Sequence, residues 1–299
     1  MSDRLFESAD LKAVRRAVSE CVRNTGWLTV IGKSGVGKTT AVNHALAAMP
    51  DVRVVEPACF DRRRLTIGAV LEATIRDLDP GETVRMGLES RSRQWRRVVG
   101  DATANGRVLI VIEEAHALHH ETLRALKRLR EVGWARQRAP LVGIVLVAQP
   151  AILPILRRVR EVGLRVTRHS VSGLTEREVG EYLRHAGFRV HAKAVKEFAR
   201  AHREPLELVN MADAARDWAV QRTHREILVE DVRATYGGEL DLGERIRQSG
   251  LSLAAIAKRA GASKSAVSAV ANGKYAGSPR VAEAVARALE GAEPASRAG

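Results

Sequence analysis

Residues 32–39, with the sequence G-K-S-G-V-G-K-T, have the residue types and spacing that bind the phosphates of a nucleoside triphosphate. The glycines let backbone N–H groups surround phosphate oxygens without an intervening side chain. Lys38 can reach the outer phosphates and take part in catalysis, and the Thr39 hydroxyl can hold Mg²⁺. The residues expected to bind ATP are Gly32, Lys33, Ser34, Gly35, Val36, Gly37, Lys38, Thr39 and Thr40.

Two adjacent acids supply the second half of the expected hydrolysis site. Glu113 and Glu114 directly follow the apolar run at residues 108–112. A buried strand that ends in acids beside a phosphate loop places one carboxylate on the metal and one on the attacking water. We therefore expect Glu113 to join Thr39 at Mg²⁺, and Glu114 to orient or deprotonate the water. The alternative is a pair of solvated acids at the start of a helix.

Further polar residues lie near the end of the next apolar run, at residues 142–147. Gln149 can hydrogen-bond the γ-phosphate or the water. The catalytic candidates beyond it are Arg157, Arg158 and Arg160, any of which can stabilise transition-state charge in the site of a neighbouring subunit. A solvated surface role is the alternative for each of these arginines. His116, His119 and His120 lack the partners of a metal site, so we interpret them as ordinary loop and helix-start residues.

The elements that must position these residues alternate between strand and helix. Strands are predicted at residues 28–31, 52–55, 108–112 and 142–147, with 164–171 as a fifth. Helices are predicted at residues 10–23, 40–48, 65–78, 91–104, 121–132 and 151–160. Because strands and helices alternate and the strands are almost continuously apolar, the fold class is α/β, with a parallel sheet covered by helices on both faces.

From residue 175 onward the pattern contains helices only, at residues 176–186, 192–202, 206–222 and 229–234. We expect a helical lid domain there and a second small all-α domain after the Tyr-Gly-Gly sequence at residues 236–238. The predicted domains are therefore a nucleotide-binding domain at 1–172, a lid at 173–236, a DNA-binding domain at 241–290 and a disordered tail at 291–299.

The all-α domain has the spacing of a helix-turn-helix. Residues 251–260 and 264–270 form two helical patterns, with a tight turn at Gly261 and Ser263 as the cap of the second helix. The polar residues expected on the exposed face, or just beyond it, are Lys264, Ser265, Ser268 and Lys274. Such side chains bind DNA phosphates or base edges. A plain helical interaction module is the alternative.

The charge balance favours a polyanionic partner. The chain has 49 Lys and Arg against 35 Asp and Glu, which gives a net charge of +14. The body residues expected to contact the DNA backbone are Arg62, Arg63, Arg64, Arg93, Arg96, Arg97 and Arg136. Solvated helix faces are the alternative. Two cysteines give no disulfide framework, and neither a signal peptide nor a membrane-spanning run is visible, so we expect a cytoplasmic protein.

Taken together, these features resemble an AAA+ ATPase over roughly residues 5–236. The runs at residues 113–123, 145–150 and 203–205 are similar to the branch that contains the target-selection ATPases of DNA transposition, of the phage Mu type. The run at 272–277 is similar to the small DNA-binding domain of that phage Mu type ATPase, a domain that precedes the ATPase there and follows it here. Two positions depart from the family: it usually has Asp where Glu113 stands, and Leu206 stands near the place of its nucleotide-sensing lid arginine, with Arg203 as a candidate substitute.

The resemblance implies an ATP-dependent protein that binds duplex DNA largely without sequence preference. It would assemble into a ring or filament, hydrolyse ATP slowly, and select target DNA for a transposase. The alternatives are a helicase-loading or replication-initiation ATPase, and a nucleotide-gated transcription regulator whose helix-turn-helix reads a defined operator.

Overall fold

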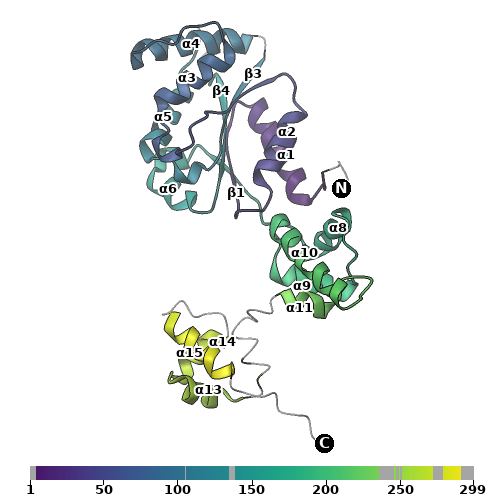
Figure 1. The fold of residues 1–299 in the computed structure, drawn as a ribbon. Helices are drawn as coiled ribbons and strands as arrows, with labels where there is room; N and C mark the ends of the chain where they lie inside the picture. Colours follow the sequence, from purple (N-terminus) through teal and green to yellow (C-terminus); the bar gives the residue numbers. More distant parts are fainter. Residues whose placement is uncertain are drawn as a thin grey trace, which may run out of the picture. The chain divides into compact units, whose positions relative to one another are not determined.

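Five parallel strands, in the order β2-β3-β4-β1-β5, form the sheet in the computed structural model of the chain (Figure 1). The strands are β1 (Trp27–Ile31), β2 (Val52–Val55), β3 (Arg107–Ile112), β4 (Val142–Ala148) and β5 (Thr167–Ser170). The structure describes residues 5–104, 106–134, 139–235, 246, 249, 251–271 and 279–290. The α/β class and all five predicted strands are confirmed; the fifth is shorter than the run at 164–171 that predicted it.

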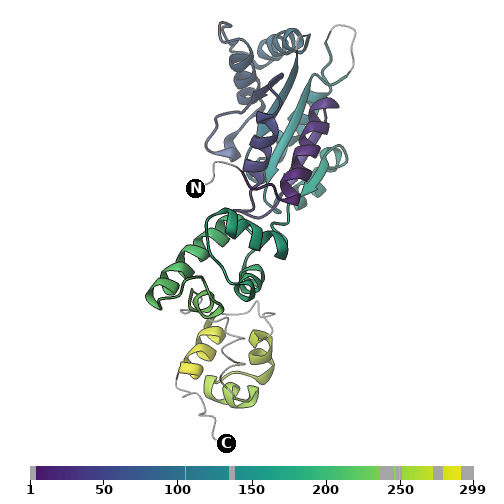
Figure 2. The ribbon, with the colours of Figure 1, turned by 90° about the vertical axis from the view of Figure 1, so that its right-hand side faces the viewer.

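Both faces of the sheet are buried because every residue of β1 and β4 is apolar or fully enclosed. Alternate strand residues point to opposite faces, so Ile110 and Ile144 belong to one core while Val111 and Val145 belong to the other. Helices α1 (Ala9–Arg23) and α2 (Lys38–Ala47) cover the second core. Figure 2 views the sheet from the side that these two helices cover.

The first core lies under four helices on the other side of the sheet (Figure 1). They are α3 (Ile67–Leu78), α4 (Leu88–Ala104), α5 (His120–Arg130) and α6 (Ile152–Arg158). The single helix predicted at residues 151–160 is wrong in one respect, because it is broken at Val159 and continues as the short α7 (Arg160–Gly163). The break lets Val159 and Val162 both reach the core, and both are fully buried.

Short 3₁₀ turns follow two of the strands and bring loop residues to the carboxyl edge of the sheet. They are η1 (Arg62–Arg64), after β2, and η2 (Ala115–Ala117), after β3. The Thr122 hydroxyl donates to the Leu65 carbonyl over 2.7 Å in a buried hydrogen bond, which ties the start of α5 to the end of η1. This buried bond therefore holds the end of η1 beside the helix that follows η2.

By contact density the chain divides into one unit of residues 1–187 and 198–210 and a second unit of residues 188–197 and 211–299. The lid helices α8 (Glu176–His185), α9 (Ala192–Ala201), α10 (Pro205–Gln221) and α11 (Val229–Thr235) are all present as predicted. Within the first unit, the Asp10 carboxylate accepts the backbone N–H groups of Ser172 and Gly173 at 2.7 and 2.9 Å. This fixes the chain where it leaves β5 for the lid.

The C-terminal helices are α13 (Leu253–Ala260), α14 (Lys264–Ala271) and α15 (Pro279–Glu290). Gly261 ends α13 with a left-handed φ of +61°, and the Ser263 hydroxyl accepts the Ala266 N–H at the start of α14. Ile256, Ala257, Val267 and Val270 are all buried and form an apolar seam between α13 and α14. The expected tail at 291–299 lies outside the described residues, and the predicted domain boundaries stay predictions.

The central strand β4 offers a test of the sheet core. Ile144 is fully buried, so Ile144→Ala should lower the free energy of unfolding of the nucleotide-binding body by about 2–5 kcal/mol. Leu164→Ala removes the same kind of side chain where it is 77% exposed, and should change that free energy by less than about 0.5 kcal/mol. Urea unfolding of the full chain without nucleotide measures both, and equal effects would contradict the assigned core.

Candidate nucleotide and DNA sites

The phosphate-binding loop lies between β1 and α2, as its sequence predicts. The Gly32 N–H donates to the Ala148 carbonyl over 3.1 Å, which joins the start of the loop to the end of β4. A Cβ on Gly32 would lie 2.8 Å from the Val171 carbonyl oxygen, so a larger residue has no room there. Gly37 caps α2 with a φ of +91° and no side-chain bond, which leaves the N–H groups of the first turn for an anion.

Lys38 lies inside the loop and is almost completely buried. Its Nζ donates to the Lys33 carbonyl over 2.7 Å, so the ammonium group is already held within the turn that would enclose the phosphates. Burial lowers the pKa of Lys38 below its usual value, and the nearby carboxylates of Glu114 and Glu113 oppose that shift. A bound phosphate would add negative charge beside the same ammonium group and favour its charged form.

Thr39 and Glu113 meet at the expected metal position. The Thr39 hydroxyl donates to Glu113 Oε2 over 3.0 Å, and Glu113 Oε1 is buried without a hydrogen-bond partner among the described residues. Burial raises the pKa of the Glu113 carboxyl above its usual range. Mg²⁺ prefers oxygen ligands, and an unpaired carboxylate oxygen beside a hydroxyl supplies two of them. These two residues therefore fit the metal that the sequence implies. The longer Glu side chain reaches Thr39 directly at the position where the family usually has Asp.

Glu114 takes a left-handed backbone conformation with a φ of +54° between β3 and η2, and its side chain is 58% exposed. His116 lies beside it, with Nε2 at 3.4 Å from Glu114 Oε2. The backbone N–H of Gln149 approaches His116 Nδ1 at 3.3 Å. The structure therefore brings Gln149 to the acid pair, but through its main chain; its side chain has no hydrogen bond to another described residue.

Arg157, Arg158 and Arg160 lie at the end of α6 and the start of α7, and all three are exposed. None of their side chains makes a hydrogen bond or an ion pair with a residue that the structure describes. Most other arginines of the sheet domain do have such partners. The trio is therefore free to act outside its own subunit, and its transfer to a neighbouring site stays a prediction.

The lid contacts the phosphate loop in a way that the sequence did not reveal. Lys33 Nζ lies 3.1 Å from Glu204 Oε1, and the Leu206 N–H donates to the Gly35 carbonyl over 3.4 Å. The Leu206 side chain packs at 3.2 Å from the place of a Cβ on Gly35. Lys33 is a variable position of the loop motif, so only the fold could pair it with a lid glutamate. Leu206, near the place where the family that the sequence resembles has a sensing arginine, thus packs an apolar side chain on the loop backbone.

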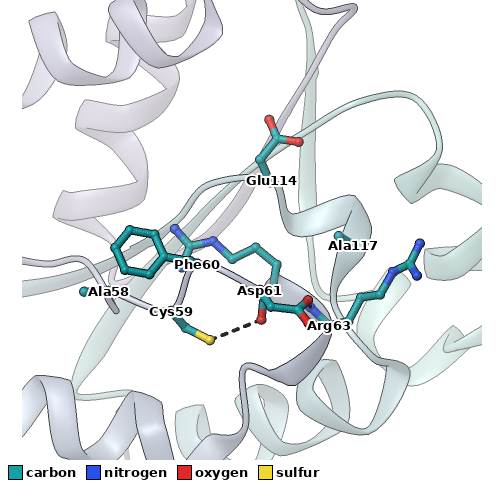
Figure 3. A pocket seen from close by; sticks show the side chains of 8 residues that line it. Ala58, Cys59, Phe60, Asp61, Arg63, Glu114 and Ala117 are labelled. Atoms are coloured by element: carbon teal, nitrogen blue, oxygen red, sulfur yellow. Dashed lines mark hydrogen bonds between the residues drawn. The ribbon is translucent and has the colours of Figure 1, made fainter.

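An open hollow of about 420 Å³ connects Glu114 with the loop after β2 (Figure 3). It is lined by Ala58, Cys59, Phe60, Asp61, Arg62, Arg63, Glu114 and Ala117. Among these lining residues, Phe60 has a fully exposed side chain. Sequence reasoning missed Phe60, because a single aromatic residue in a loop carries no pattern.

The predicted DNA-binding arginines of the sheet domain are of two kinds: those that already have partners within the chain, and those without a partner among the described residues. Arg93 pairs with Glu89, Arg96 donates to the Gly133 carbonyl over 2.6 Å, and Arg97 lies 2.7 Å from Glu82. These three side chains are thus engaged in contacts within α4 and between α4 and neighbouring segments. In η1, Arg62 donates to the Pro57 carbonyl and Arg64 lies 3.3 Å from Asp61.

Arg63 differs from the rest of that set. Its side chain is exposed and has no hydrogen bond or ion pair within the described part of the chain. Arg136 lies outside the described residues. Of the sheet-domain set, Arg63 is therefore the residue best placed to take a phosphate.

In the C-terminal helices, Lys264 and Ser265 are exposed at the start of α14, and Ser268 is half-buried one turn later. The Ser263 and Ser265 hydroxyls lie 3.0 Å apart, so one of them donates a hydrogen bond to the other at the start of α14. Lys274 lies outside the described residues. The ring centroids of His119 and His120 lie 4.1 Å apart, with the rings tilted by 38°. The described residues contain no cluster of His, Cys, Asp and Glu that could hold a metal. No described helix has the length and apolar content needed to cross a bilayer.

Comparison with protein families agrees with this geometry. A family described as an AAA domain matches residues 22–156, and a family described as a helix-turn-helix domain matches residues 241–298. The chain thus contains an AAA domain, which implies an ATPase that binds ATP and Mg²⁺, followed by a DNA-binding helix-turn-helix domain. The comparison with curated proteins gave no match.

Several solved structures share the fold. The Aeropyrum pernix ORC2 protein in ADPNP–ADP complexes has a TM-score of 0.54 and 14% identity, over 98% of this chain and 83% of that one. Cdc6p from Pyrobaculum aerophilum has a TM-score of 0.55 and 18% identity, over 94% and 79%. The Aeropyrum pernix ORC1 protein in complex with DNA has a TM-score of 0.53 and 16% identity, over 96% and 79%. At such identities the similarity establishes the fold, and it does not single out the transposition branch that the motifs suggested.

The buried ammonium group of Lys38 provides a direct test of the nucleotide site. Lys38→Ala removes the charge that would contact the outer phosphates, and should weaken ATP binding by on the order of 100-fold, equivalent to about 3 kcal/mol. Lys127→Ala, on α5 in an ion pair with Glu131, is the matched control and should leave ATP binding unchanged. Titration with a fluorescent ATP analogue measures both; an unchanged affinity in Lys38→Ala would contradict the assigned loop.

Proposed function

We propose that the chain is an ATP-controlled DNA-binding ATPase that assembles on duplex DNA when ATP is bound and leaves it after hydrolysis. In this proposal Lys38, Thr39 and Glu113 hold the nucleotide and its Mg²⁺. Glu114 activates the attacking water, and an arginine from a neighbouring copy completes the site. The helix-turn-helix domain and the loop after β2 supply the DNA contacts.

The observation that carries the proposal is the contrast between paired and unpaired charge. The acids and the lysine of the nucleotide site converge on one edge of the sheet, whereas Arg157, Arg158 and Arg160 have no partner among the described residues. Exposed arginines without partners are suited to an anion that arrives from outside, whether a γ-phosphate of the next subunit or the DNA backbone.

Two biological settings suit this activity, and replication initiation is the better supported. The structures with the same fold include ORC and Cdc6 replication-initiator proteins, one of them in complex with DNA. We therefore place helicase loading or replication initiation first. The second setting is target selection for a transposase, which rests on the sequence motifs at residues 113–123, 145–150, 203–205 and 272–277.

A binding assay with purified partners separates the two settings. The ATP-bound chain, immobilised on duplex DNA, is offered the replicative helicase and a transposase from its own host. Helicase retention that depends on ATP would support the first setting. Retention of the transposase alone would move the assignment to the second.

The proposed assembly can be observed directly. Negative-stain imaging of the full chain with ATP and random duplex DNA should reveal rings or filaments that neither ATP nor DNA produces alone. Glu114→Gln keeps the shape of the side chain but removes its basicity, so it should bind ATP normally, lose hydrolysis and prolong the assembly. An equal assembly without nucleotide, or no assembly in any condition, would contradict the proposal.

The difference between Arg63 and Arg97 predicts which arginine contacts DNA. Arg63→Ala should weaken DNA binding several-fold and reduce the dependence of log affinity on log salt by about one contact. Arg97→Ala removes the same charge from an ion pair with Glu82, and should leave DNA affinity unchanged. Fluorescence anisotropy with a labelled duplex over a salt series measures both. The reverse ranking would refute the assigned DNA-facing loop.

A further inference from the structure

His116 lies between the Glu114 carboxylate and the backbone of Gln149. It lies in η2, two positions after Glu114, and its side chain is 19% exposed. Both ring nitrogens have partners. Nδ1 faces the backbone N–H of Gln149 at 3.3 Å, and Nε2 faces the Glu114 carboxylate at 3.4 Å.

These partners fix the tautomer of a neutral ring. A backbone N–H can only donate, so Nδ1 must be the acceptor and carries no proton. The proton of the neutral imidazole then lies on Nε2, where it points at Glu114. His116 therefore turns its ring N–H toward the Glu114 carboxylate, in an electrostatic contact of 3.4 Å that favours one direction of this side chain.

Glu114 has few other restraints. Its side chain is 58% exposed, and within the described residues this side chain makes a single ion-pair contact, with His116. A glutamate side chain has up to about 2 kcal/mol of rotamer freedom to lose when it is ordered. Without a partner the carboxylate would sample several directions, and only some of them face the phosphate loop.

The anchor on the other side of the ring is rigid. Gln149 directly follows β4, and Ala148, the last residue of that strand, accepts the Gly32 N–H at the start of the phosphate loop. The chain of contacts runs from Glu114 through His116 to the end of β4, and from there to the loop. Its two ends are the acid and the loop that would hold the γ-phosphate.

We propose that His116 is a positioning residue for ATP hydrolysis, which fixes Glu114 relative to the phosphate loop by linking it to the backbone of Gln149. The proposal rests on the ATPase activity proposed above and deepens it. It assigns a role in the reaction to a histidine whose sequence context alone indicated an ordinary loop residue.

Three substitutions at one position test the link. An asparagine oxygen takes the place of Nδ1 but its side chain is too short to reach Glu114, whereas a glutamine amide takes the place of Nε2 and can donate to Glu114. His116→Ala and His116→Asn should therefore lower kcat by on the order of 10- to 100-fold, with KM and ATP affinity nearly unchanged. His116→Gln should restore most of kcat. His119→Ala, a nearby histidine that caps α5, is the control and should hydrolyse ATP normally.

Steady-state hydrolysis by the full chain, with ATP affinity and thermal unfolding measured on each variant, separates positioning from folding. Equal loss in His116→Gln and His116→Ala, or normal kcat in His116→Ala, would overturn the role of His116 alone. A wild-type chain that binds ATP and never hydrolyses it would contradict the proposed ATPase and, with it, this role.

Discussion

The nucleotide site depends on the position of β4 between β1 and β3. Parallel pairing brings the carboxyl ends of the three strands to one edge, in a register where Ile31 lies beside Ala148 and Ile112 lies beside Leu146. The phosphate loop follows β1 and the acid pair follows β3. These two strands do not pair with each other, because β4 lies between them. The end of β4 bridges them, because Ala148 accepts from Gly32 and Gln149 donates to His116. A shift of β4 by one residue would reverse its faces and separate the halves.

Burial shapes the electrostatics of the same edge. Lys38 and Glu113 are both taken largely out of water, and desolvation disfavours the charged form of each. Neither group pairs directly with the other: the lysine donates to a carbonyl, and the carboxylate accepts from a threonine. Each group therefore keeps part of its charge uncompensated, as a site must if it is to gain from binding phosphate and a cation. Nucleotide with Mg²⁺ would supply the missing negative and positive partners together.

The sequence predicted the local parts of this arrangement and missed the parts made by long-range contacts. The strands, the phosphate loop, the acid pair and the turn at Gly261 follow from periodicity and from glycine chemistry, both of which act over a few residues. The break at Val159 was missed because a helical pattern continues through it. The Lys33–Glu204 pair and the link from His116 to Gln149 join residues far apart in the chain, at positions whose types suit ordinary surface loops equally well.

Net charge alone does not identify which arginines are available to contact DNA. The count of arginines treats Arg63 and Arg97 alike, yet the structure commits Arg97 to Glu82 and leaves Arg63 exposed without a partner among the described residues. An arginine already in an ion pair must break that pair before it can neutralise a phosphate, so it adds little to DNA affinity. Phe60 is exposed in the same loop as Arg63, and an aromatic face is suited to stack on a sugar or base. That loop also lines the hollow that contains Glu114, which places a candidate DNA contact next to the group proposed to activate water.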